Sequence, residues 1–304
     1  MEIFDEHLDM TVEAVEIECY HCGATTSMPP QTSDDRCPFC ATPLPIDEAV
    51  MKRLWKPDYI LPFKITEKEC VDIVRKRIFK WWLASSKLKN IALAPNNFKG
   101  VYLPFWSYDS NTYTEYQGEC AVESRTTHKN DDDKTKEDTI TDYYRVSGNV
   151  NVSFNDVSVS ASLSLPETVI NEIGDWDTKN CVEYRNEFLE GFFTEICQQD
   201  FRDLLDEAKK EMGYDIDNAI KKDIGGDMQR INTKKTEFAD IKFKHLLLPV
   251  WVCAFHFNNK IYQFVVNARS GKIHGKIPGK KLRIAVLVLI IIIFATIIKS
   301  ITNI

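Results

Sequence analysis

The chain has 304 residues, of which 44% are apolar, and a formal net charge of −7. This length predicts about two domains, and this apolar fraction is ordinary for a globular protein with a buried core. Residues 1–9 carry four acids and no base, so a signal peptide is not expected there, and the cysteines outside the motif below favour a reduced cytosolic setting.

An acidic tail (residues 1–14) precedes a predicted zinc ribbon (residues 15–46). The ribbon contains two C-x2-C pairs that are separated by 14 residues, and each pair can bring two thiolates to one ion from a tight turn. Four thiolates complete a tetrahedral shell, so His21 inside the first pair is not needed as a ligand. The predicted ligands of one structural Zn²⁺ per chain are Cys19, Cys22, Cys37 and Cys40.

Charge is segregated along the chain. Residues 1–50 carry 11 acids and one base, Arg36, whereas residues 51–100 carry 12 bases and four acids. Binding to nucleic acid depends on neutralising phosphates, so we do not expect this acidic ribbon to bind it alone. The ribbon is predicted to be a structural element that stabilises the fold or a module that contacts other proteins. The alternative is a nucleic-acid-associated accessory factor that uses the basic segment, chiefly Arg75, Lys76, Arg77 and Lys80.

The body, residues 47–278, is predicted to be α+β, with antiparallel strands covered by helices on one side. Thr66 and Glu69 form a capping box that begins a helix whose apolar positions, from Cys70 to Trp81, face the core. Residues 124–141 indicate a solvated hairpin tip, because they are rich in Lys, Asp and Thr.

Alternating apolar residues predict a long strand from Val150 to Leu165, and a slip in phase at Asn155-Asp156 indicates a bulge or turn. A long helical region is expected at residues 178–212 and a short helix at 215–223, ended by Gly225-Gly226. Two paired strands, residues 245–257 and 260–267, are expected to meet around Asn258-Asn259.

The C-terminal segment, residues 279–304, is predicted to be a basic flank followed by a single transmembrane helix. Residues 284–298 contain 15 residues without charge, about 22 Å as a helix, and further apolar residues extend the run. The preceding bases predict a cell-membrane, single-pass protein whose N-terminal body lies in the cytoplasm and whose anchor contacts membrane lipid. The alternative is a buried segment of the body.

No recognisable catalytic motif is present, so we do not expect an enzyme. There is no Walker A loop, nucleophile elbow or H-E-x-x-H zinc motif in the sequence. Cys253 and His256 have the residue types of a nucleophile and a base, but positions three apart on a strand face opposite sides. His245 beside an apolar strand is expected to be an interior or edge histidine. An enzyme that uses a pocket in the body is the third hypothesis.

Five segments resemble a bacterial family of membrane-anchored zinc-ribbon proteins, commonly labelled as primosomal replication-restart helicase-like. They are residues 59–64, 100–106, 154–162, 224–231 and 243–251. The resemblance runs from the ribbon to the C-terminal segment and implies roles only for the four cysteines, as zinc ligands. A helicase motor requires motifs for phosphate binding and ATP hydrolysis that this sequence lacks.

The resemblance also implies a functional context. Relatives are often encoded near SPFH (flotillin-type) proteins and membrane-stress proteins, so partners of this kind are expected. The leading hypothesis is therefore a non-catalytic adaptor, held at the membrane, that recruits protein partners.

Overall fold

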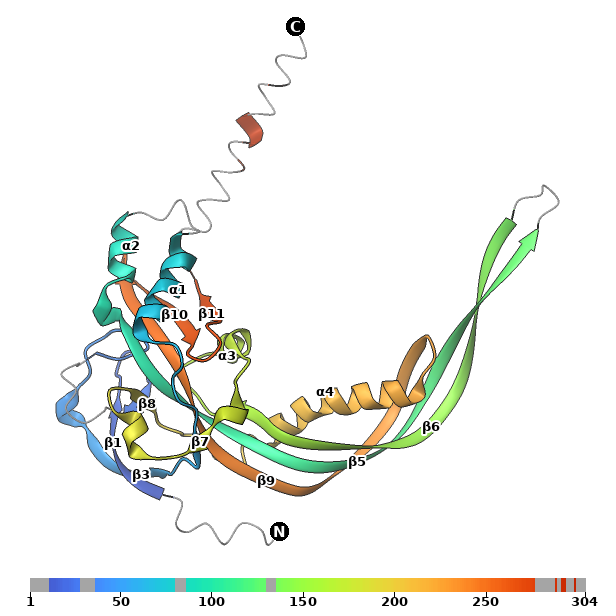
Figure 1. Cartoon of the computed structure of the whole chain (residues 1–304), viewed down its shortest axis with the longest axis horizontal. Helices are drawn as coiled ribbons and strands as arrows, with labels where there is room; N and C mark the ends of the chain where they lie inside the picture. Colours follow the sequence, from blue (N-terminus) through green and yellow to red (C-terminus); the bar gives the residue numbers. More distant parts are fainter. Residues whose placement is uncertain are drawn as a thin grey trace. The chain divides into compact units, whose positions relative to one another are not determined.

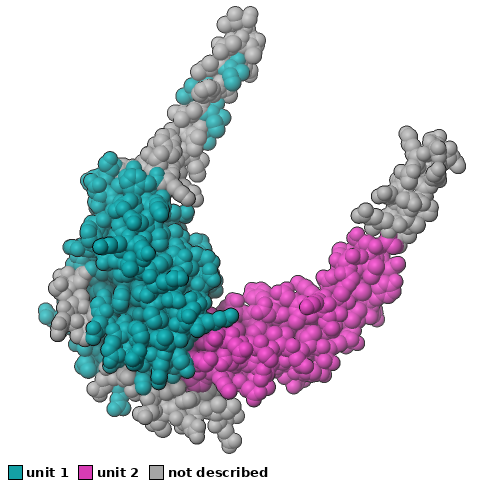
Figure 2. Space-filling model, viewed as in Figure 1, with its two compact units in different colours: residues 1–105, 160–198, 245–304 teal, residues 106–159, 199–244 magenta. Residues whose placement is uncertain are grey.

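The computed structural model describes residues 11–27, 36–79, 86–129, 135–276, 288, 291–293 and 298. The chain divides into two compact units, shown in different colours in Figure 2. Unit 1 comprises residues 1–105, 160–198 and 245–304, and unit 2 comprises residues 106–159 and 199–244. The four cysteines of the predicted ribbon lie in unit 1.

Short strands and helices make up most of unit 1 (Figure 1). Its strands are β1 (Thr11–Glu18), β2 (Thr25–Ser27), β3 (Val50–Trp55), β4 (Tyr59–Ile60), β7 (Val182–Glu183), β8 (Phe193–Glu195), β10 (Lys260–Asn267) and β11 (Ile273–Gly275). Its helices are α1 (Glu67–Phe79), α2 (Ser86–Ala92) and α3 (Glu167–Ile173), with 3-10 turns η1 (Ile46–Glu48), η2 (Pro95–Asn97), η3 (Thr178–Asn180) and η4 (Asn186–Leu189).

The long strands of the protein run through both units. They are β5 (Phe98–Lys129), β6 (Thr135–Ser160) and β9 (Met228–Phe257), and unit 2 adds the helix α4 (Leu205–Ile224). The predicted solvated tip at residues 124–141 is largely strand, because β5 and β6 extend into it from either side; residues 130–134 lie outside the described residues.

Residues 245–255 of β9 are all buried, and this reflects burial on both faces of the strand. Val250 and Val252 pack in a core shared with the cysteine ribbon and α3. Trp251 and Cys253 pack in a second core with α1 and α2. A strand covered on both faces reads as a continuous apolar run instead of an alternating one.

Helix α1 begins and packs as the sequence predicts. The backbone N–H of Thr66 donates to Glu69 Oε2 at 2.8 Å and the N–H of Glu69 donates to Thr66 Oγ1 at 3.4 Å, which together form the capping box. Cys70, Val74 and Ile78 are buried on the core-facing side. The predicted continuation of the helix to Trp81 lies outside the described residues.

In unit 2, α4 lies along the long strands (Figure 1). Its buried residues recur every four positions and form one apolar face, which consists of Ala208, Met212, Ile216, Ile220 and Ile224. Gly225 and Gly226 follow with positive φ angles of 67° and 74°, which confirms the predicted stop. Asp156 adopts a φ of 60° at the predicted slip in β6, and Asn258 and Asn259 also have positive φ at the β9–β10 turn.

The sheet differs from the predicted antiparallel sheet, because it is mixed. The described strands form an eleven-stranded sheet in the order β11-β10-β9-β5-β8-β2-β1-β3, with β4, β6 and β7 off this path. The pairings described include two parallel ones, β4 with β9 and β5 with β8. Each of these parallel registers covers two residue pairs, and such short contacts leave no periodic signal in the sequence.

The predicted helix at residues 178–212 is wrong. This region contains η3, β7, η4 and β8, and α4 begins only at Leu205. Tyr184, Phe188 and Phe192 are spaced four apart, but they pack in a small core around Ile60, Tyr102 and Leu247. Tertiary packing of aromatic side chains on strand residues therefore overrides the helical spacing.

The predicted single C-terminal transmembrane helix is also corrected. Within the described ranges, no helix is both long enough and apolar enough to cross a membrane. As a helix, the uncharged run of 15 residues is about 22 Å long, which is shorter than a hydrocarbon core of ~30 Å. Most of residues 277–304 lie outside the described residues. The predicted cell-membrane localisation and single-pass topology, which depended on this anchor, are corrected with it.

Candidate metal centre

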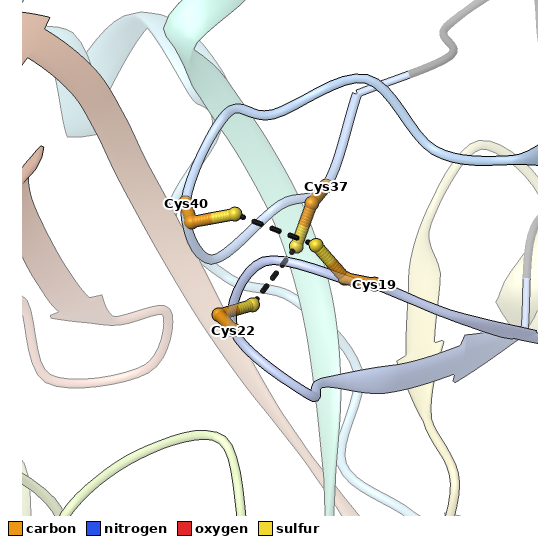
Figure 3. Close-up of side chains that lie close together, drawn as sticks. All are labelled: Cys19, Cys22, Cys37 and Cys40. Carbon is orange, nitrogen blue, oxygen red and sulfur yellow. Dashed lines mark hydrogen bonds between the residues drawn. The ribbon is translucent and has the colours of Figure 1, made fainter.

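The four cysteines of the two C-x2-C pairs converge on one point (Figure 3). Their four sulfur atoms lie within 4.8 Å of one another, with Cys19 Sγ 3.6 Å from Cys40 Sγ and Cys22 Sγ 3.7 Å from Cys37 Sγ. These separations exceed a disulfide bond of about 2.05 Å. Tetrahedral zinc with Zn–S bonds of about 2.3 Å requires sulfurs about 3.8 Å apart, so the cluster fits such an ion.

Two similar turns present these sulfurs. In the first, the N–H of Gly23 donates to the carbonyl of Cys19 at 2.8 Å, and in the second, the N–H of Ala41 donates to the carbonyl of Cys37 at 2.9 Å. Gly23 and Ala41 follow the second cysteine of each pair with φ angles of 72° and 61°. This left-handed residue reverses the chain directly after each pair, so that both sulfurs of a pair point inward.

Hydrogen bonds and burial shift the pKa values of the thiols in opposite directions. The hydrogen bond from the Cys37 thiol lowers the pKa of Cys22 to about 5, and the same contact, together with burial, raises the pKa of Cys37. Burial raises the pKa of Cys40 to about 11. A divalent cation bound among the sulfurs stabilises all of them as thiolates, so metal binding at this cluster releases protons.

The second cysteine pair is packed against the body, whereas the turn of the first pair is exposed. Cys37, Phe39 and Cys40 are buried. The carbonyl of Phe39 accepts a hydrogen bond from Gln263 Nε2 at 3.1 Å, and the carbonyl of Cys40 lies 3.0 Å from His256 Nε2. In the first pair, Cys19 is buried, but residues 20–23 are exposed. The cluster is therefore closed toward β9 and β10 and open to solvent at one turn.

The buried carboxylate of Glu195 links strand β8, which neighbours the ribbon, to residues 162–164. Glu195 on β8 is paired with Thr26 on β2, and its carboxylate accepts four hydrogen bonds. The donors are the hydroxyls of Ser162 and Ser164, at 2.6 and 2.7 Å, and the backbone N–H groups of Leu163 and Ser164, at 3.0 and 2.9 Å. Burial raises the pKa of Glu195, and these four donors oppose that effect.

Sequence reasoning missed Glu195, because it assigned this residue to a helix. Glu195 lies between Phe193 and Ile196, which are both buried. An acidic residue between apolar residues was the sequence signal that could have indicated a buried, hydrogen-bonded carboxylate.

Cys253 and His256, which have the residue types of a catalytic pair, contact different parts of the structure. Cys253 is buried and its thiol donates to the carbonyl of Ala92 at 3.3 Å, whereas His256 lies against the carbonyl of Cys40. His245 is buried, as the sequence indicated.

A polar pocket of about 410 Å³ in unit 1 contains the Arg269–Asp177 ion pair (2.6 Å). Its described lining residues include no nucleophile paired with a base.

The basic residues of α1 are exposed on the side away from the core. Arg75, Lys76 and Arg77 are all solvent-exposed, and Arg75 forms an ion pair with Asp72 at 2.5 Å. Lys80 lies outside the described residues. Exposed bases beside a core-facing stripe are typical of an amphipathic surface helix.

The comparisons with known proteins indicate no biochemical activity. No family model matches the chain, and no solved structure matches it. A protein of Bacillus subtilis (strain 168) described as "Uncharacterized protein YdjG" is 22% identical over 236 residues, which is 75% of this chain and 66% of that protein. The match therefore spans slightly less than two thirds of the relative's length.

Proposed function

We propose that the cluster of Cys19, Cys22, Cys37 and Cys40 binds one structural Zn²⁺ per chain. The sulfur separations of 3.6 and 3.7 Å support this proposal, because they match a four-thiolate tetrahedral shell. Four protein ligands leave no open position for a substrate or an activated water, so the ion stabilises the fold and takes no part in catalysis.

The test of the metal is elemental analysis of the purified protein together with cobalt substitution. We expect about one zinc per chain, and Co²⁺ in its place should give the intense visible bands of tetrahedral thiolate coordination. A Cys19→Ser/Cys22→Ser variant should lose both signals. Binding of iron in preference to zinc in protein from a zinc-replete culture would contradict the assignment of the ion.

The chain itself is proposed to act as a non-catalytic adaptor that contacts protein partners. The observation that supports this is the asymmetric burial of the metal centre. One cysteine turn is packed on the body, while Tyr20, which is 72% exposed, and His21 stand on the other turn. A rigid, metal-held turn with an exposed aromatic ring is a suitable anchor for a protein interface, since aromatic residues are enriched at such interfaces.

Co-purification of tagged wild-type protein with a matched variant tests the adaptor role. Tyr20→Ala/His21→Ala removes the exposed side chains but keeps all four cysteines, so zinc content should be unchanged while partner recovery falls. SPFH-type or membrane-stress proteins are the partners that the family resemblance implies. Equal recovery with the variant would contradict a role of this turn.

The same experiment addresses the nucleic-acid alternative through a nuclease control. Recovery of replication proteins with nuclease-sensitive DNA, and binding of DNA that weakens steeply with salt, would replace the adaptor proposal with an accessory factor that uses Arg75, Lys76 and Arg77.

A further inference from the structure

In the described part of the chain, strand β6 has one edge without a neighbouring strand. Among the described strands it pairs with β5 alone, and β5 lies between β6 and β9 in unit 2 (Figure 1). An unpaired edge presents a row of backbone N–H and C=O groups that can pair with another chain. Natural edges are usually protected by lysine, proline or very short strands. Residues 146–155 of β6 contain no charged residue and no proline.

The sequence of this edge is nearly palindromic. Residues 146–154 read V-S-G-N-V-N-V-S-F, with Val150 at the centre. If two antiparallel copies pair about Val150, Asn149 of one lies opposite Asn151 of the other, and Ser147 lies opposite Ser153. Val146 then faces Phe154. Gly148 faces Val152 and is the one mismatch; every other residue meets one of its own class, which is the self-complementarity that a two-fold interface requires.

The two faces of β6 also match across such a pair. A Cβ on Gly148 would lie 2.8 Å from the hydroxyl of Tyr116 and 3.0 Å from a carboxylate oxygen of Asp223 on α4, so even-numbered positions here face α4. Val150 and Val152 on this face are half-buried, whereas Asn149 and Asn151 on the other face are exposed. A two-fold axis perpendicular to the sheet keeps each face on its own side, so the half-buried valines gain cover.

We propose that two copies of this chain associate through antiparallel pairing of their β6 edges, centred on Val150. The pairing joins the two sheets edge to edge and places ladders of Asn and Ser on the open face, where cross-strand side chains hydrogen-bond. The positive φ of Asp156 ends the regular edge one residue after Asn155. This interface lies in unit 2 and does not involve the cysteine cluster, so it goes beyond the proposed function.

Sedimentation velocity and light scattering over a concentration series provide the first measurement. The wild-type chain should reach twice its mass of 35.1 kDa as concentration rises. In Asn149→Lys/Asn151→Lys, the new lysines of each copy face those of the other, and the dimer dissociation constant should rise at least about tenfold. Both positions are exposed, so circular dichroism should show an unchanged fold.

A matched control keeps the added charge but moves it off the β6 edge. Gln117→Lys/Thr233→Lys places two lysines at exposed positions of β5 and β9. This variant should dimerise like the wild type. If it dissociates as readily as the edge variant, added charge and not edge pairing explains the loss, and the proposal fails.

Charge complementation tests the register directly. Asn149→Asp/Asn151→Asp should also be monomeric by itself, but an equimolar mixture with the lysine variant should restore a dimer, because each lysine then faces an aspartate. The proposal is overturned if the wild type stays monomeric, if the lysine variant keeps wild-type affinity, or if the mixture remains monomeric.

Discussion

His245 shows how a single buried side chain makes stability depend on pH. Its backbone N–H donates to Asp58 Oδ2 at 2.6 Å, and its carbonyl accepts from the N–H of Asp58 at 2.9 Å, where β9 meets the chain before β4. The imidazole is 3% exposed, and burial lowers its pKa from 6.5 to about 4. The ring is therefore neutral in the folded protein at neutral pH.

The lowered pKa predicts a loss of stability in mild acid. Below pH 6.5 the unfolded chain takes up a proton at this position and the folded chain does not, so the free energy of unfolding falls as pH drops from 6.5 toward 4. The shift corresponds to roughly 2–4 kcal/mol. Urea titrations at pH 7.5 and 5 should show this fall, and His245→Gln should reduce it. An equally steep fall in the variant would exclude His245 as the cause.

The cysteine ligands are predicted to differ sharply from the other cysteines. Cys37→Ser removes a buried ligand and should abolish stoichiometric zinc and lower the free energy of unfolding, because metal binding and folding of the ribbon are coupled. Cys120→Ser changes a half-buried cysteine of unit 2 and is the control. Metal analysis and urea denaturation of both variants check this. Full zinc content in Cys37→Ser would contradict the four-thiolate site.

At the scale of elements, α4 covers a sheet face that bears hydroxyl groups. Thr114 Oγ1 lies 2.9 Å from Thr236 Oγ1, and Thr112 Oγ1 donates to the carbonyl of Val152 at 2.9 Å. Because these hydroxyls are satisfied across the strands, they are buried at little cost beneath the apolar face of the helix. Gly118 lets α4 approach, since a Cβ there would lie 2.7 Å from the Ile224 side chain.

Truncating the centre of the apolar face should destabilise unit 2. Ile216 is 1% exposed, and Ile216→Ala is expected to lower the free energy of unfolding by about 2–5 kcal/mol through lost burial and a cavity. Tyr214 on the same helix is 68% exposed, so Tyr214→Ala should change it by less than about 0.5 kcal/mol. Chemical denaturation of both variants tests the orientation of α4, and similar losses would contradict it.

An element could be predicted from the sequence when its signal lies within a few neighbouring residues. The capping box of Thr66 and Glu69, the stop at Gly225 and the local irregularity at Asp156 were predicted correctly, because each depends on neighbouring residues and backbone dihedrals. The helix expected at residues 178–212 was wrong. Its aromatic residues are four apart, but they pack on distant strands, and no local pattern encodes those contacts.

At the scale of the molecule, the cysteine ribbon is part of the core of unit 1 and not a separate head. Ile17, Phe39 and Leu44 belong to the same apolar cluster as Leu103 and Val250. Strand β2 of the ribbon also pairs with β8. Loss of the proposed ion should therefore affect more than the loops that carry the four cysteines.

Removal of the metal should accordingly weaken the whole of unit 1. Incubation with a strong chelator is expected to lower the urea midpoint and expose the apolar cluster, detected as binding of a hydrophobic dye. The Cys37→Ser variant, which lacks the site, should not respond to the chelator. An unchanged midpoint in chelated wild-type protein would show that the core holds the ribbon without a metal.

The sequence by itself identified the four cysteines that cluster, the charge segregation and the local turns, because cysteine spacing and capping act over a few residues. It could not determine the mixed sheet, the burial of one cysteine turn against β10 or the role of Glu195, since these depend on residues brought together from distant parts of the chain. The transmembrane prediction depended on hydropathy alone, and it is corrected because no helix in the described part of the chain is long and apolar enough to cross a membrane. The tertiary structure alone revealed that one edge of β6 has no partner among the described strands, because an edge is defined by its neighbours in the sheet and not by its own residues.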